Sequence, residues 1–263
     1  MDCGSISVVS TVPTLDVFHS NGPPATDLAR EAWLMERAAK GSISLFLTSW
    51  VGPVVVLGYA QNAGEADLDL CRAESIPVLR RLTGGTGVIH RGDLGVGLAL
   101  PIQHPWAHGI VGLYGRFLDV LEPALRRMGS EVKRLDDTVH ASRVRSPICF
   151  LDQLSDTLVV AGKKTVGCAQ TRRGGAVLIH AAILLGLDVE LYSRVFGVAK
   201  SRVRKGLAPA LPGADQRTVG DAIAAGLSDA LGLEVQNRRL KPVPDRFLEP
   251  YESKRWAPVM PGR

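Results

Sequence analysis

The chain has 263 residues, of which 46% are hydrophobic and 22% are charged, and its formal net charge is +5. These values fit one globular domain, and the absence of an apolar run of about 18 residues argues against a membrane-spanning helix. The four cysteines form no C-x-x-C pair, which disfavours a zinc site or a disulfide scaffold and favours a reducing cytoplasm. No nucleic-acid motif accompanies the basic residues, so we expect an acidic protein or an anionic small molecule as partner, and neither nucleic acid nor a membrane.

The first half of the chain alternates between helical and strand patterns. The N-terminus has no basic segment leading into an apolar core, so we expect it to belong to the folded protein. Helical spacing of apolar residues predicts a helix over 26–39. Runs of β-branched and apolar residues predict strands at 43–48, 53–57, 76–81 and 94–100.

The second half contains two further helical patterns and a pair of strands around a glycine. We predict a helix over 111–128, and another over 219–231 that begins with a capping box of Thr218 and Asp221. Segments 156–161 and 163–168 flank Gly162 and predict a hairpin, and 176–185 predicts a long strand. The expected fold is α+β with a mixed or mostly antiparallel sheet. We expect a domain over 1–240 and a tail over 241–263 that packs on it.

The most informative segment is 79–90, LRRLTGGTGVIH. A predicted strand ends at Arg80 and Arg81 and is followed by a loop with three glycines in four positions. These glycines let the backbone approach a ligand closely and point several N–H groups towards it. Such a loop beside an arginine suits an anion such as phosphate or an acyl phosphate. The glycines alone are equally compatible with a tight turn between two strands.

This segment closely resembles the R-R-x-(S/T)-G-G-x-x-V-x-H motif of the lipoate–protein ligase, octanoyltransferase and biotin ligase superfamily. Residues 161–172, AGKKTVGCAQTR, are similar to its second block, G-(R/K)-K-(I/L/V)-x-G-(S/N)-A-Q-x-R. Weaker similarity covers 27–35, 57–61, 178–185 and the ending YESKRW. The resemblance runs from about residue 26 to 256. It implies a single biotin/lipoate-ligase-like catalytic domain with a mixed, mostly antiparallel sheet flanked by helices, and we expect a monomer.

The resemblance also assigns residues to a site. The family's invariant lysine falls on Lys164, whose cation would stabilise charge on the acyl carbonyl during transfer, although Lys163 and Lys164 by themselves fit an exposed charged hairpin. Arg81 falls on the arginine that contacts nucleotide phosphate in the ligases, and we expect His90 and His180 to be structural. We expect no metal site in the protein itself. The implied substrate- and nucleotide-binding residues are Arg81, Thr83, Gly84, Gly85, Thr86, Gly87, Val88, Ile89, His90, Asp93, Lys164, Gly167 and Ala169.

Cys149, in SPICF, lies just upstream of the second block. One octanoyltransferase branch has a nucleophilic cysteine in a C-F context here, and a thiolate could take the acyl group from a carrier thioester and pass it to a lysine. A buried, inert thiol remains an alternative. We expect Cys168, which replaces the usual serine or asparagine, to be a packing residue.

The two activities of the family differ in the acyl donor. The small Thr86 leaves room for an adenylate, whereas Asp93-Leu94 replaces the ligases' G-N pair and Cys149 fits the transferase. We favour a lipoate–protein ligase that uses ATP with Mg²⁺ to form lipoyl-AMP or octanoyl-AMP and acylates a lysine of a lipoyl carrier protein. The alternatives are a cysteine-dependent octanoyltransferase fed by octanoyl-acyl carrier protein, and an inactive module that binds acylated carriers. Exposed basic residues should steer the carrier, with candidates among Arg126, Arg127, Lys133, Arg134, Arg202, Arg204 and Lys205.

Overall fold

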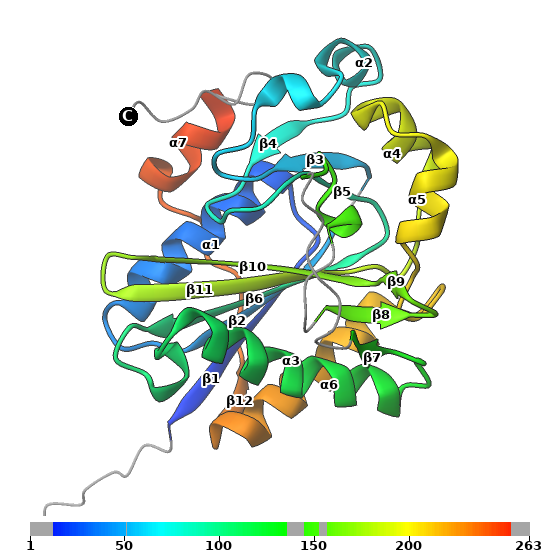
Figure 1. Ribbon diagram of the computed structural model, residues 1–263. Coiled ribbons are helices and arrows are strands. Elements are labelled where there is room, and N and C mark those ends of the chain that lie inside the picture. Colours follow the sequence, from blue (N-terminus) through cyan, green and yellow to red (C-terminus); the bar gives the residue numbers. More distant parts are fainter. Residues whose placement is uncertain (1–12, 51, 136–144, 153–156, 254–263) are drawn as a thin grey trace, which may run out of the picture.

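The computed structural model describes residues 13–50, 52–135, 145–152 and 157–253, which Figure 1 shows as coloured ribbons. Its centre is a six-stranded sheet in the order β10-β11-β6-β2-β1-β12. Neighbouring strands are antiparallel from β10 to β2, whereas β1 runs parallel to both β2 and β12. The strands are β1 (Thr14–Ser20), β2 (Ser44–Ser49), β6 (Leu94–Pro101), β10 (Val166–Arg173), β11 (Ala176–Ile183) and β12 (Glu234–Asn237).

Two small sheets stand beside the large one. In the first, β3 (Val54–Leu57) pairs parallel with β4 (Val78–Arg80) and antiparallel with β5 (Val88–His90). In the second, β8 (Leu158–Val160) lies antiparallel between β7 (Lys133–Arg134) and β9 (Lys163–Lys164). The glycine-rich segment joins β4 to β5, and Lys164 ends β9, so each small sheet carries one of the two motifs.

Helices cover both faces of the large sheet (Figure 1). Helix α1 (Pro24–Ala38) packs on one face, with α7 (Asp245–Ser253) against its outer side, and α3 (Ile110–Arg127) and α6 (Gln216–Leu231) pack on the other. Helices α2 (Leu68–Ala73), α4 (Val189–Phe196) and α5 (Lys200–Gly206) surround the small sheets. Three short 3-10 turns complete the elements: η1 (Ala63–Glu65), η2 (Pro105–Ala107) and η3 (Cys149–Leu151).

Strand β11 shows why the sheet is buried on both faces. Val177, Ile179 and Ile183 belong to the core formed with α3 and α6, whereas Ala176 and Leu178 belong to the core formed with α1. This alternation follows from the two-residue period of a strand. His180 has the same parity as Leu178, and its ring therefore points towards α1.

The mixed sheet flanked by helices confirms the predicted α+β class. The predicted helices at 26–39, 111–128 and 219–231 correspond to α1, α3 and α6. The capping box predicted at Thr218 is wrong: α6 begins at Gln216, and the side chain of Asp215 accepts the N–H of Thr218. Aspartate is a strong N-cap because its carboxylate accepts an otherwise unpaired amide of the first turn.

The predicted hairpin of 156–161 and 163–168 is only partly correct. Val159 and Val160 do pair with Lys164 and Lys163, but the chain then leaves this sheet at Thr165. From Val166 onward it forms β10 of the large sheet. Residue 156, the N-terminal residues 1–12 and the end of the YESKRW segment lie outside the described residues. Helices α2, α4, α5 and α7, the inner strand β1 and the edge strand β12 were not predicted. All four residues of β12 are exposed, so its sequence has no buried alternation to identify it.

Candidate active site

The glycine-rich loop sits where β4 ends and β5 begins. Gly85 has a φ of 89°, which favours glycine, and a Cβ at Gly58 would collide with the carbonyl of Gly85. Glycine is thus required at both positions for the loop to lie against the segment after β3. The backbone N–H groups of Gly84, Gly85 and Thr86 donate to no acceptor among the described residues. They remain available for an anionic or carbonyl oxygen.

Arg81 braces this loop from inside. Its side chain donates to Thr83 Oγ1 at 3.0 Å, Val56 O at 3.2 Å, Gly84 O at 2.6 Å and Thr86 O at 3.0 Å. The residue is only 5% exposed, and burial lowers the pKa of its guanidinium. Four of its five N–H donors are therefore occupied by the protein, and a role in contacting nucleotide phosphate stays a prediction.

Arg80 holds the loop from the other side. Its guanidinium donates to the carbonyl oxygens of Gly58 at 2.6 Å, Tyr59 at 3.0 Å and Gln61 at 2.7 Å. Both arginines of the motif thus fix backbone geometry.

A chain of polar contacts joins the loop to α1. Thr83 Oγ1 lies 2.6 Å from His180 Nε2, and His180 Nδ1 lies 3.1 Å from a carboxylate oxygen of Glu31. With the proton on Nδ1, the histidine donates to Glu31 and accepts from Thr83. Glu31 was not among the predicted residues. Because it precedes His180 by 149 positions, only the packing of α1 on the sheet brings the two together.

Cys149 lies directly beside the loop. Its N–H donates to Gly87 O at 2.9 Å, and the N–H of Gly87 donates to Pro147 O at 2.9 Å. A Cβ at Gly167 would be 3.5 Å from Cys149 Sγ, so the thiol also faces the start of β10. The structure therefore brings together Cys149, the glycine-rich loop and the second motif.

Lys164 orders the turn that carries this cysteine. Its ammonium donates to Cys149 O at 2.9 Å and to Asp152 O at 2.7 Å, and the residue is 7% exposed. An exposed charged hairpin is therefore wrong for Lys164. The buried cation is held close to the cysteine backbone, where it adds positive potential next to the thiol.

A narrow cavity of about 40 Å³ connects these elements. Its walls come from both motifs, from α1 and from β6, and they are mainly apolar. Burial raises the pKa of Cys168, which also lines it, to about 12 in spite of the opposing effect of Lys164. This thiol stays protonated near neutral pH and is a poor competitor for Cys149 as nucleophile. The cavity is lined by Leu28, Glu31, Thr48, Trp50, Val56, Arg81, Val88, His90, Gly95, Val96, Cys149, Gly167, Cys168, Ala169, His180, Ala181 and Ala182.

His90 closes the other end of the motif. Its Nδ1 lies 2.6 Å from Asp93 Oδ2, and its ring stacks on Trp50 with centroids 4.2 Å apart. Nearby, the N–H of Ile89 donates to the hydroxyl of Tyr192 at 3.1 Å. Of the predicted residues between positions 81 and 93, Arg81, Val88 and His90 line the narrow cavity.

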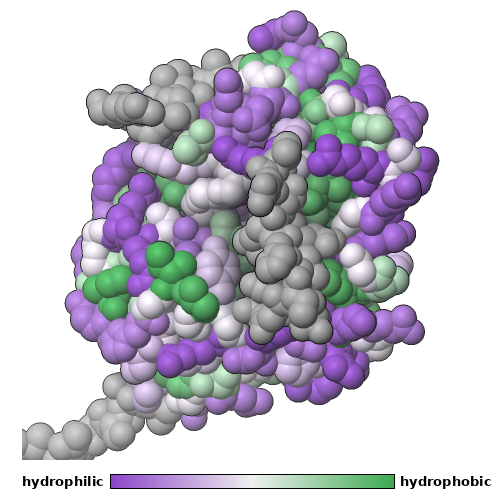
Figure 2. Space-filling view, in the orientation of Figure 1, coloured by the Kyte–Doolittle hydropathy of each residue, from purple (hydrophilic) through white to green (hydrophobic). Residues whose placement is uncertain are grey.

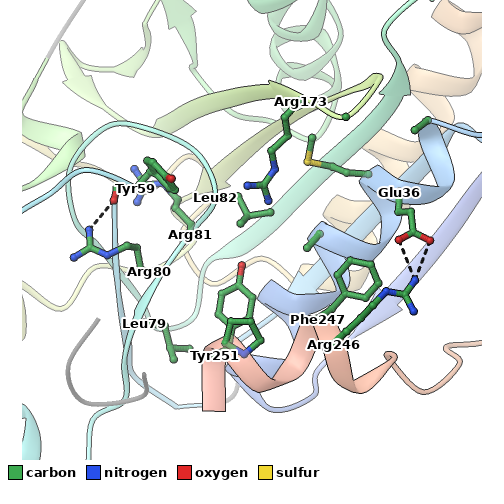
Figure 3. A pocket seen from close by; sticks show the side chains of 15 residues that line it. Glu36, Tyr59, Leu79, Arg80, Arg81, Leu82, Arg173, Arg246, Phe247 and Tyr251 are labelled. Atoms are coloured by element: carbon green, nitrogen blue, oxygen red, sulfur yellow. Dashed lines mark hydrogen bonds and ion pairs between the residues drawn. The ribbon is translucent and has the colours of Figure 1, made fainter. Parts of the chain in front are cut away.

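A larger cavity of about 540 Å³ lies between α1, α7, the turn from β10 to β11 and residues 79–82 of the first motif. In Figure 3 the side chains of Leu82, Arg173 and Tyr251 converge on it, while Arg246 pairs with Glu36 at its margin. Only Arg81 lines both cavities. Cys149 lines the narrow cavity and not the larger one, so size alone does not identify the reactive centre.

No group of three or more histidine, cysteine, aspartate or glutamate side chains in the described part of the chain could hold a metal ion. Among the helices in the described ranges, none is long and apolar enough to cross a membrane.

Comparisons with known proteins place this geometry in a family. The fold is similar to that of "lipoate-protein ligase A bound with ATP", with a TM-score of 0.74 and 21% identity over 94% of this chain and 96% of that chain. It is also similar to a bi-partite lipoate protein ligase from Thermoplasma acidophilum, whose structure was described with its E2 lipoyl domain, with a TM-score of 0.71 and 20% identity over 93% and 94% of the two chains. Octanoyltransferase LipM of Kyrpidia tusciae is 28% identical over 89% of this chain and 94% of its own length.

The family model of the lipoyl protein ligase A/B catalytic domain matches residues 23–214. The chain belongs to this family, as the sequence motifs predicted, and is an enzyme of lipoyl or octanoyl transfer.

Proposed function

We propose that this protein is a cysteine-dependent octanoyltransferase that moves a medium-chain acyl group from an acyl carrier thioester to a lysine of a lipoyl domain. The observation that carries the proposal is the position of Cys149, hydrogen-bonded to the glycine-rich loop and held by Lys164. The similarity to relatives such as Octanoyltransferase LipM supports the same choice. It departs from the ligase that the sequence favoured and adopts its stated alternative.

The proposed reaction has two balanced steps. The Cys149 thiolate attacks the carbonyl of the donor thioester, a new thioester forms on the enzyme, and the donor leaves as a thiolate. The amine of the acceptor lysine then attacks the enzyme thioester, an amide forms, and the Cys149 thiolate is released as the amine loses a proton. The N–H groups of Gly84, Gly85 and Thr86, which have no acceptor among the described residues, are candidates to stabilise the oxyanion that develops in both steps.

Lys164 has a positioning role in this scheme. Its two hydrogen bonds hold the carbonyl groups of Cys149 and Asp152, which fixes the turn and places a cation beside the nucleophile. Cys168, with its raised pKa, takes no part.

The ATP-dependent ligase is the second candidate. The free amides of the loop would also hold phosphate oxygens of a nucleotide, whereas the donors of Arg81 are engaged internally. The inactive binding module is the least supported possibility, because the loop, the lysine and the cysteine are assembled together.

Intact-protein mass spectrometry separates the mechanisms. The protein is incubated with octanoyl-acyl carrier protein without ATP, or with octanoate and ATP, and then with a lipoyl domain. We expect an octanoyl adduct on the enzyme from the carrier donor, its absence in Cys149→Ala and its retention in the matched control Cys168→Ser. Acylation of the lipoyl domain that requires ATP and survives in Cys149→Ala would overturn the proposal in favour of the ligase.

A further inference from the structure

The larger cavity of about 540 Å³ has the size and the walls of a small-molecule site. Pockets that bind small ligands usually have volumes of about 300–1,000 Å³ and apolar walls with a few polar groups. Here α1 contributes Ala32, Met35 and Ala39 to the wall, and α7 contributes Phe247 and Pro250. On the face of the molecule drawn in Figure 2, the coloured hydrophobic residues form small groups between hydrophilic ones. The cavity therefore offers an apolar ligand more shelter than this outer surface does.

Most charged side chains on the wall of this cavity are already engaged. Arg80 and Arg81 donate to backbone carbonyl groups, and Glu36 pairs with Arg246. Arg173, at the end of β10, is different: it is exposed, and its guanidinium has no hydrogen bond or ion pair with any described residue. Its positive charge is therefore available to an anionic group of a ligand.

The hydroxyl of Tyr251 lies on the same wall without a partner. The residue is 9% exposed, and its buried oxygen forms no hydrogen bond with any described residue. In Figure 3 this hydroxyl points towards Leu82 and the guanidinium of Arg173. Burial and the charge of Glu31 raise the pKa of the hydroxyl, and the cation of Arg173 opposes them, so the hydroxyl keeps its proton and can donate. A buried hydroxyl without an acceptor is costly, and a ligand oxygen would relieve that cost.

We propose that the larger cavity binds a small monocarboxylate with an apolar body, such as a free medium-chain fatty acid. Its carboxylate lies between Arg173 and Tyr251, accepting hydrogen bonds from the guanidinium and from the hydroxyl, and its chain packs on Met35 and Phe247. One free cation and one neutral donor match the single charge of a carboxylate. A phosphate that carries two charges would remain only half neutralised, because the neighbouring arginines are engaged elsewhere.

This site is separate from the reactive centre. Neither Arg173 nor Tyr251 lines the narrow cavity, and Cys149 does not line the larger one. Binding at this site therefore does not depend on the octanoyltransferase function proposed above.

Calorimetric titration with octanoate and three analogues tests the site. Octanol and octylammonium keep the chain and replace the carboxylate with a neutral or a cationic group, and octyl phosphate replaces it with a group that can carry two charges. Each ligand is titrated into wild type, Arg173→Gln, Tyr251→Phe and the matched control Arg202→Gln. Arg202 is an exposed arginine of α5 that has no described partner and does not line the cavity. Urea unfolding of each protein without ligand measures its stability.

We expect octanoate to bind wild type with a Kd of about 1 mM or tighter. Octanol and octylammonium should bind at least about tenfold more weakly. Arg173→Gln should weaken octanoate binding at least about tenfold and Tyr251→Phe about three- to tenfold, because each removes a hydrogen bond that involves a charged group. Arg202→Gln should stay within about twofold of wild type, since a distant exposed charge is screened by salt. Without ligand, Tyr251→Phe should be at least as stable as wild type, because the lost hydroxyl has no partner.

Three results would overturn the inference. The first is octanoate binding that stays unchanged in both Arg173→Gln and Tyr251→Phe, because octanoate would then occupy another site. The second is tighter binding of octanol or octyl phosphate than of octanoate, which would exclude a carboxylate site. The third is the absence of measurable octanoate binding to wild type. Failure of the octanoyltransferase function would be distinct, since it would appear as a missing acyl-enzyme on Cys149 and would leave these titrations unaffected.

Discussion

Replacing Arg81 with lysine tests whether the first motif acts mainly as an internal brace. The guanidinium makes four hydrogen bonds, to Val56 O, Thr83 Oγ1, Gly84 O and Thr86 O. A lysine keeps the charge but offers one compact ammonium, which cannot reach acceptors spread around a planar fork. We expect it to recover one or two of the four bonds.

The expected cost follows from the lost bonds. Hydrogen bonds to a charged group contribute about 1.5–3 kcal/mol each. Part of the loss is offset because Gly84 is exposed and its carbonyl can bind water. Arg81→Lys should therefore lower the free energy of unfolding by about 3–5 kcal/mol. Displacement of the loop by about 1 Å should slow acyl-enzyme formation by about 100-fold.

Urea unfolding followed by circular dichroism measures the stability, and mass spectrometry of the acyl-enzyme measures the rate. Arg239→Lys, at an exposed position without a described partner, is the matched control and should change neither quantity. The role of Arg81 in holding the loop would be refuted if the free energy of unfolding of Arg81→Lys lay within about 1 kcal/mol of the wild-type value and its acyl-enzyme formed at a near-normal rate. A stable protein that has lost only ATP-dependent activity would indicate that Arg81 binds phosphate.

Three further predictions concern other parts of the site and core. Asp27→Asn should stabilise the protein by up to about 2 kcal/mol near pH 8 and not near pH 4, because burial raises the pKa of Asp27 to about 6. The folded state holds this proton more tightly than the unfolded chain, so wild type loses stability as the pH rises through about 6. A lower free energy of unfolding for the variant than for wild type near pH 8, measured by urea unfolding, would contradict this. Gly87→Ala places a Cβ 2.5 Å from Phe196 Cζ, which should lower the free energy of unfolding by about 1–3 kcal/mol and slow acylation. In the control Gly84→Ala the added Cβ has no neighbour within 4 Å, so this variant should be as stable as wild type. Lys164→Ala should reduce single-turnover acyl transfer by about 100-fold or more, a far larger effect than its loss of stability, and near wild-type turnover would show that the lysine is dispensable.

The sequence by itself determined the family and the strongly patterned elements. The glycine-rich segment, Lys164 and the long amphipathic helices are local features, in which the spacing of residues along the chain carries the information. Even there, the capping residue of α6 was misplaced, because Asp215 and Thr218 are both competent caps and only the backbone position distinguishes them. Helix α5 was missed because most of its side chains are charged and only Val203 of the helix is buried.

Only the tertiary structure decided how the site is assembled. The pairing of Cys149 with Gly87 and the contact of His180 with Glu31 join segments that are 62 and 149 positions apart. Such pairings depend on the packing of sheets and helices, which no local pattern encodes. The role of Arg81 was decided in the same way: the sequence identified a cation beside a glycine loop, but the fold buries it and turns its donors onto the backbone of the protein itself. A buried guanidinium must find acceptors because leaving it unpaired away from water is costly, and the nearest ones are the carbonyl groups of its own loop.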